Sequence, residues 1–247
     1  MLKKLYDKSQ LVFSLVWIVS YCLLMSVGDG LSAALGVEKL ISLPVGLLLS
    51  AVLLVFLKTN GLAATYGLCR PGRPTRETLF YLPLVLLLTA NLWFGVRLNA
   101  SGVETVLYIL TMLFVGFLEE VIFRGLLFEA MRRDNERAAI LVSSVTFGIG
   151  HIINLINGSG AELVPNLLQV VYATAAGFLF VMLYCRTQSL IVPIVTHGIF
   201  NALSVFAAPP PTPAWRVGSA LVLAVIAGAY AAWLAFGKGH SNEHHKR

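Results

Sequence analysis

Residues 117–131 read FLEEVIFRGLLFEAM, and this stretch decides how the rest of the chain is interpreted. Two adjacent carboxylates, Glu119 and Glu120, and one guanidinium, Arg124, stand among apolar residues and glycine. The residues before them, 103–116, are similarly apolar apart from Glu104. A charge at the centre of a bilayer helix costs about 3 kcal/mol on insertion scales, so these three groups need partners or water. The cluster therefore predicts a functional site inside a membrane.

The composition of the whole chain supports a membrane protein. Of the 247 residues, 57% are hydrophobic and 12% are charged, and the mean hydropathy is +0.81. An ordinary soluble domain has roughly twice that share of charged residues. The formal net charge of +6 is spread over short loops, so we expect no nucleic-acid partner and take the lipid bilayer as the partner instead.

Eight apolar runs approach the ~20 residues that a helix needs to cross the hydrocarbon core. They are 11–27, 40–57, 78–94, 103–131, 138–156, 163–185, 189–207 and 217–236. The fourth would reach about 43 Å at 1.5 Å per residue, so its end should project beyond the hydrocarbon. The predicted fold class is all-α: a polytopic membrane helix bundle of about eight transmembrane helices, with the active site inside the bundle.

The loops between these runs predict an orientation. With the N-terminus inside, the cytoplasmic loops hold Lys3, Lys4, Lys8, Lys58, Arg70, Arg73, Arg76, Arg132, Arg133, Arg137, Arg186, Lys238, Lys246 and Arg247. The opposite side holds Lys39, Arg97 and Arg216. Since cytoplasmic loops are enriched in lysine and arginine, both termini are predicted to be cytoplasmic. We expect a cell membrane, a bacterial plasma membrane, with a site opening toward the cytoplasm, where the glutamate helix ends.

The chain divides into three parts by its motifs. Residues 1–102 hold three helices and a cytoplasmic loop, residues 103–207 hold the catalytic helices, and residues 208–247 hold the last helix and a cytoplasmic tail. The cysteines lie far apart and predict neither a disulfide framework nor a metal site.

Helical spacing separates the roles of the two glutamates. Glu120 and Arg124 are four positions apart, with the acid first, which is the better order for an ion pair. Glu119 lies about 100° further round the helix, so it is left without this counter-ion. A salt-bridged helix end is the structural alternative for the pair alone. The second carboxylate favours a chemical role.

Two further helices carry histidines. Residues 147–154 read FGIGHIIN, with Phe147, His151 and Asn154, and residues 196–201 read THGIFN, with His197 and Asn201. A lone histidine in a membrane helix is more often packed and hydrogen-bonded than catalytic. However, Glu119, His197 and His151 lie about 18, 12 and 20 Å from the cytoplasmic ends of their helices. Three helices therefore bring polar groups to one level.

With Glu-Glu-x-x-x-Arg, Phe-x-x-x-His and His-x-x-x-Asn in this order, the sequence resembles the CPBP family of intramembrane proteases, which includes the CAAX-processing Ras-converting endoproteases. The resemblance covers about 103–207. It implies that Glu119 is the general base, that His151 helps to hold the water, and that His197 and Asn201 face the oxyanion. Glu120 would be mainly structural, oriented by Arg124. Phe147 would pack the wall, and Asn154 would be a secondary contact.

The resemblance also implies a reaction and leaves one alternative mechanism. The substrate would be a peptide or membrane protein, lipidated in the CAAX branch, cut near its C-terminus. Glutamate-activated water needs no cofactor, whereas zinc held by Glu119, His151 and His197 would make the protein a metalloprotease. The sequence has no local HExxH motif, and we favour the metal-free mechanism.

Two other function classes use the same residues differently. Glu119, Glu120, His151 and His197 would form a proton or cation path in a transporter, but the chain shows no inverted repeat or paired broken helices. A membrane scaffold or bacteriocin-immunity protein would need no catalysis at all. Replacing Glu119 by alanine separates these classes.

Overall fold

The computed structural model describes residues 2–71, 78–157 and 161–236. These residues form a bundle of helices with no strand, the only extended pairing among them being an isolated bridge between Val96 and Ala207. The longer helices are α2 (Gln10–Ala34), α3 (Ser42–Thr59), α5 (Gly102–Glu120), α7 (Glu136–Gly150), α8 (Leu163–Thr187), α9 (Ile191–Leu203) and α10 (Pro213–Phe236). The prediction of an all-α bundle is confirmed.

Each of the eight apolar runs of the sequence coincides with a helical segment. Six are long and apolar enough to cross a membrane: Gln10–Ala34, Ser42–Thr59, Gly102–Arg132, Glu136–Leu155, Leu163–Thr187 and Pro213–Phe236. Two described segments are shorter, Leu82–Leu92 and Ile191–Phe206. The third run is α4 (Thr78–Leu88), with Pro83 inside it, followed by the 3-10 turn η1 (Ala90–Leu92). The chain is therefore a polytopic membrane protein, and its three-part division stays a prediction.

The fourth run is one continuous helical segment with a change of geometry inside it. Ser101 caps its N-terminus and Glu104 reaches back to the Ser101 backbone, which satisfies the first free amides. After α5 the chain widens into a π-helix, η2 (Val121–Leu127), and then becomes α6 (Phe128–Arg132). All seven residues of η2 are buried. π-Helical turns of this kind occur frequently at functional sites.

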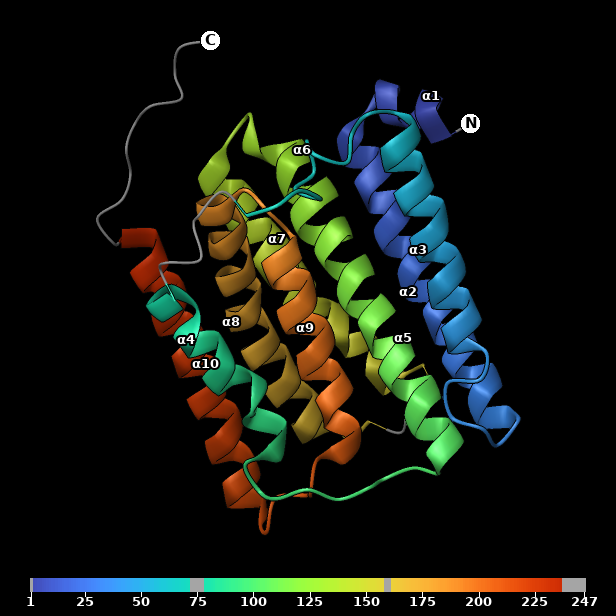
Figure 1. Ribbon diagram of the computed structural model, residues 1–247, viewed down its shortest axis with the longest axis vertical. Helices are drawn as coiled ribbons and strands as arrows, with labels where there is room; N and C mark the ends of the chain where they lie inside the picture. The colour runs from blue at the N-terminus through green and yellow to red at the C-terminus, as the bar shows by residue number, and fades with distance from the viewer. Residues whose placement is uncertain (1, 72–77, 158–160, 237–247) are drawn as a thin grey trace.

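The glutamate helix crosses the middle of the bundle. In Figure 1, α2 and α3 lie on one side of α5, and α9, α8 and α10 lie on the other. Glycines bring α5 and α9 together, because a Cβ atom on Gly116 would stand 2.6 Å from the amide nitrogen of Gly198. The close approach places His197 beside the two glutamates.

The end of the bundle that carries α1 (Leu2–Lys8) and α6, the upper end in Figure 1, is tightly packed. Tyr6 hydrogen-bonds to Tyr66 at 2.8 Å between the hydroxyl oxygens. The Tyr6 ring makes edge contacts with Phe13, Phe56 and Tyr66. All four side chains are buried, and we call them the upper aromatic cluster.

Candidate active site

The two adjacent glutamates have different surroundings. Glu120 is fully buried, and its Oε1 accepts a hydrogen bond from Arg124 Nη1 at 3.0 Å. Glu119 lines a cavity, and its Oε1 accepts a hydrogen bond from the Tyr21 hydroxyl at 2.7 Å. Arg124 forms its ion pair with Glu120 rather than Glu119, as the helical spacing predicts. Glu119 is thus left facing the cavity.

Arg124 is held by aromatic rings as well as by its carboxylate. The side chain is fully buried, with its guanidinium carbon 4.1 Å from the centre of the Phe147 ring and 5.5 Å from that of Phe180. A desolvated cation over an aromatic face gains up to about 2 kcal/mol. Phe147 therefore has a second role besides lining the cavity, because its ring contacts the guanidinium of Arg124.

His197 bridges the two glutamates. Its Nδ1 lies 2.8 Å from Oε1 of Glu120, and its Nε2 lies 3.4 Å from Oε2 of Glu119. The imidazole stacks on Phe180 with centroids 5.5 Å apart, and Phe147 meets it edge-on at 5.6 Å. An ionised carboxylate only accepts hydrogen bonds, so Nδ1 carries a proton.

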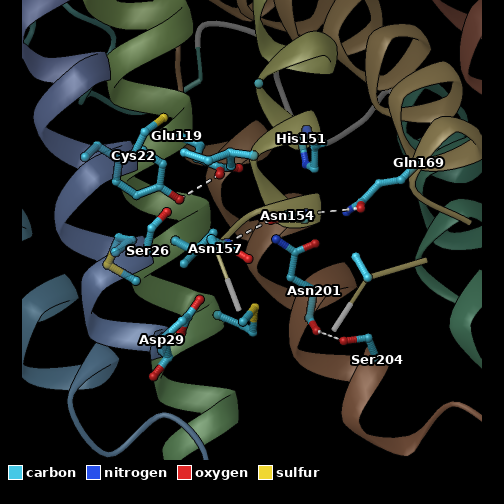
Figure 2. Close-up of a pocket in the computed structure, with 18 of the residues that line it drawn as sticks. Cys22, Ser26, Asp29, Glu119, His151, Asn154, Asn157, Gln169, Asn201 and Ser204 are labelled. Carbon is cyan, nitrogen blue, oxygen red and sulfur yellow. Dashed lines mark hydrogen bonds between the residues drawn. The ribbon is translucent and has the colours of Figure 1, made fainter. Parts of the chain in front are cut away.

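His151 lies at the point where α7 changes into the 3-10 turn η3 (His151–Leu155). Its Nδ1 lies 3.0 Å from the carbonyl oxygen of Phe147, and Asn166 donates to the His151 carbonyl at 2.8 Å. Because a carbonyl only accepts, Nδ1 of His151 carries the proton and Nε2 keeps a lone pair. Figure 2 shows His151 in the wall of the same cavity as Glu119.

The cavity has a volume of about 420 Å³ and a wall of mixed polar and apolar side chains. Asn201 lines it, and Asn154 lines it while donating to Gln169 Oε1 at 3.2 Å. Further polar groups in the wall are Asn91 and, labelled in Figure 2, Cys22, Ser26, Asp29, Asn157 and Ser204. Of the predicted site residues, Glu119, Phe147, His151, Asn154 and Asn201 line this cavity. Glu120, Arg124 and His197 form the buried network behind Glu119.

Residues from the first three helices also belong to the site, which the sequence analysis missed. Tyr21 on α2 is hydrogen-bonded to Glu119, and Cys22, Ser26 and Asp29 extend the cavity wall along the same helix. A buried tyrosine hydroxyl usually finds a polar partner. The position of Tyr21 in the middle of an apolar run is the sequence feature from which this contact could have been predicted.

The direction in which the cavity extends follows from its lining residues. From Glu119 its lining residues continue along α2 to Asp29, in the last two turns of that helix, and along α9 to Ser204, which follows the helix. The expectation that the site opens at the cytoplasmic end of the glutamate helix stays a prediction; η2 beyond Glu119 is buried at every position, and of its residues Phe123 lines the cavity. The other lining residues continue toward the end of the bundle opposite to the N-terminus.

The metal alternative depends on Glu119, His151 and His197. Nδ1 of each histidine is directed to an oxygen acceptor, as is usual for histidines that bind a metal through Nε2, and Nε2 of His197 lies 3.4 Å from Oε2 of Glu119. Within residues 2–71, 78–157 and 161–236, however, no three His, Cys, Asp or Glu side chains are grouped as metal ligands. The proposal below therefore follows the metal-free mechanism that the sequence analysis favours.

The comparisons with known proteins agree with the motifs. The family model described as "Type II CAAX prenyl endopeptidase Rce1-like" matches residues 101–203. The Bacillus subtilis (strain 168) protein "Putative membrane peptidase YdiL" is 38% identical over 89 residues, which are 36% of this chain and 31% of that protein. The chain thus spans about a third of the length of this relative. No solved structure matches the chain. Both matches agree with the predicted resemblance: residues 101–203 are similar to the Rce1-like family model, and part of the chain is similar to a protein named as a putative membrane peptidase.

Proposed function

We propose that the chain is an intramembrane endopeptidase that hydrolyses a peptide bond near the C-terminus of a membrane-associated protein or peptide. The observation that carries this proposal is the division of labour between the glutamates. Glu120 is committed to Arg124 and His197, whereas Glu119 reaches the cavity with Tyr21 as its hydrogen-bond donor. A carboxylate held in a cavity by one donor is suited to general-base catalysis.

In the proposed reaction, a water molecule in the cavity lies between Glu119 and His151. It donates one hydrogen bond to Glu119 and the other to Nε2 of His151, the nitrogen that keeps its lone pair. Glu119 accepts a proton as the water oxygen attacks the carbonyl carbon. Glu119 then returns that proton to the leaving nitrogen as the C–N bond breaks. General acid–base catalysis of this kind contributes about 10² to 10⁴ in rate.

The negative charge that develops on the substrate oxygen needs donors. In the proposal, Nε2 of His197, which lies 3.4 Å from Oε2 of Glu119, is one donor, and Glu120 orients the ring through Nδ1. The side-chain amide of Asn201, four positions further along α9 in the cavity wall, supplies the second donor. Removing one such donor typically costs 10² to 10³ in kcat, so Asn201→Ala should retain weak activity.

A direct test is cleavage of labelled peptides by the purified chain in liposomes, with the products identified by mass spectrometry. We expect Glu119→Gln to lower the cleavage rate at least about 100-fold. The matched control is Glu136→Gln, whose half-exposed side chain lies at the start of α7, and it should cleave like the unchanged chain. A Glu119→Gln variant that cleaves normally would overturn the mechanism.

The same assay separates the alternatives. A metal chelator should leave the rate unchanged if Glu119 activates the water, whereas a loss that zinc restores would replace this mechanism with a metal-dependent one. Including prenylated peptides shows whether lipidation of the substrate is required. Absence of cleavage together with Glu119-dependent proton flux would assign the chain to transport, and a cellular role that survives Glu119→Ala would indicate a scaffold.

A further inference from the structure

We infer that the cavity takes its substrate from the extracytoplasmic side of the membrane, as an extended peptide segment exposed on that face. The inference rests on the proposed function only in taking the cavity as the place of cleavage. Its structural basis is the difference between the two ends of the bundle: one is closely packed, and the cavity extends toward the other.

Among the described residues, the end that carries α1 and α6 is closely packed beyond Glu119. The π-helix η2, which continues directly from Glu120, is buried at every position. Beyond it, Phe128 is fully buried and meets Tyr184 edge-on at 5.9 Å. The upper aromatic cluster fills the space beside α2 and α3. A substrate arriving from this end would have to displace close-packed rings.

The opposite end leads directly to Glu119. From α2 the wall continues through Ser26 to Asp29, and from α9 it continues through Asn201 to Ser204. Asn157 and Ala161, which precede α8, complete the described outer part. Figure 2 shows Asp29 and Ser204 at one end of the cavity and Glu119 at the other. The described residues at the outer end are partly exposed, so the cavity is accessible there.

The distribution of basic residues assigns these ends to sides of the membrane. Of the described lysines and arginines outside the bundle interior, nine lie at the α1 and α6 end: Lys3, Lys4, Lys8, Lys58, Arg70, Arg132, Arg133, Arg137 and Arg186. The end with the cavity mouth has three: Lys39, Arg97 and Arg216. Because lysine and arginine are retained on the cytoplasmic side, we take the end with α1 and α6, called the sealed end below, as cytoplasmic. The opposite end, where Asp29 and Ser204 form the mouth of the cavity, is then extracytoplasmic.

The chemistry of the outer cavity indicates what it accepts. Asp29 and Lys39 form an ion pair at 2.9 Å, and both line the mouth. Ser42 also donates a hydrogen bond to Asp29. Asn91, Asn154, Asn157, Gln169 and Asn201 supply amide groups along the wall. Amide side chains can both donate to and accept from a peptide backbone, whereas an acyl or prenyl chain offers them neither a donor nor an acceptor. The mouth therefore suits a polar peptide segment.

Cysteine accessibility tests the sidedness without requiring catalysis. Cys22, Cys69 and Cys185 are half-buried and free. In a chain with Cys22→Ala and Cys185→Ala, the native Cys69 reports the sealed end. Adding Cys69→Ser and Ser26→Cys instead reports the cavity, with a nearly isosteric change. Cells expressing each variant are treated with a charged, membrane-impermeant maleimide, and labelling of the purified chain is measured by mass.

We expect Ser26→Cys to be labelled in intact cells at least about tenfold faster than Cys69, and Cys69 to react fully only after the membrane is permeabilised. The reverse pattern, equal labelling of both, or protection of Ser26→Cys until permeabilisation would each overturn the inference. Labelling of Ser26→Cys from outside should also abolish cleavage of a charged peptide by right-side-out vesicles. If labelling shows the expected sides but no peptide is cut, the proposed function fails while the sidedness stands.

Discussion

The Nδ1 atom of His197 lies 2.8 Å from Oε1 of Glu120, although the two residues are 77 positions apart in the chain. The same oxygen accepts from Arg124 at 3.0 Å. Glu120 therefore orients the imidazole and neutralises the guanidinium at once. Its neighbour Glu119 is left to Tyr21 and the cavity, so two adjacent carboxylates have separate tasks because they face different helices.

The first prediction separates stability from activity at the two glutamates. Glu120→Gln should lower the unfolding free energy by about 3–5 kcal/mol, because it leaves the Arg124 charge buried without its counter-ion. Glu119→Gln should unfold near the normal temperature, because an amide oxygen still accepts from Tyr21. Thermal unfolding in detergent measures the difference. Equal unfolding temperatures for the two variants would show that the Glu120–Arg124 pair carries no such energy.

A double variant checks the cause of that loss. Glu120→Gln combined with Arg124→Met removes both charges and should recover much of the stability, since apolar replacements of buried pairs are often neutral or stabilising. Cleavage should not recover, because His197 still lacks the carboxylate at Nδ1. Recovery of cleavage in the double variant would remove Glu120 from the proposed mechanism.

The second prediction concerns the planar guanidinium group of Arg124. Arg124→Lys keeps the charge but loses the planar group over Phe147 and Phe180, and an ammonium is more strongly hydrated than a guanidinium. We expect a stability loss of about 1–2 kcal/mol and reduced cleavage. Lys58→Arg, at the end of α3, is the control for exchange of these residue types and should change neither quantity.

Tyr21 gives the third prediction, for a positioning residue. Tyr21→Phe removes the hydroxyl that donates to Glu119, so we expect kcat to fall about tenfold while KM stays nearly constant. A hydrogen bond to a charged group contributes about 1.5–3 kcal/mol. The control Tyr66→Phe removes a tyrosine hydrogen bond at the sealed end, and it should lower the unfolding temperature without changing kcat. An unchanged kcat in Tyr21→Phe would leave the contact without a catalytic role.

The bundle and much of the candidate site could be predicted from the sequence because both depend on local spacing. Apolar length predicted the eight longer helical segments, although not the short helix α1, and the four-residue interval predicted the Glu120–Arg124 pair. The π-helix η2 could not be predicted, since neither hydrophobicity nor spacing distinguishes it from an α-helix of the same length. Tyr21 and the direction of the cavity also depend on how α2 packs against the catalytic helices. Such contacts between distant segments leave no periodic pattern.

The last prediction tests the close approach of α5 and α9 that places His197 beside Glu120. Gly116→Ala would put a Cβ atom 2.6 Å from the Gly198 nitrogen and 2.7 Å from its Cα atom. Both obstacles are backbone atoms, so α9 has to move and the 2.8 Å contact of His197 has to lengthen. We expect a stability loss of about 1–3 kcal/mol from overpacking and a larger loss of kcat/KM.

The matched control for that change is Gly218→Ala, in α10, where an added Cβ atom meets nothing within 4 Å. Alanine is favoured over glycine in a helix by about 1 kcal/mol, so this variant should unfold at the same or a higher temperature and cleave normally. If Gly116→Ala behaves like Gly218→Ala in both assays, the spacing of α5 and α9 does not set the position of His197. Cleavage that falls in Gly116→Ala alone ties the geometry of the histidine to these two glycines.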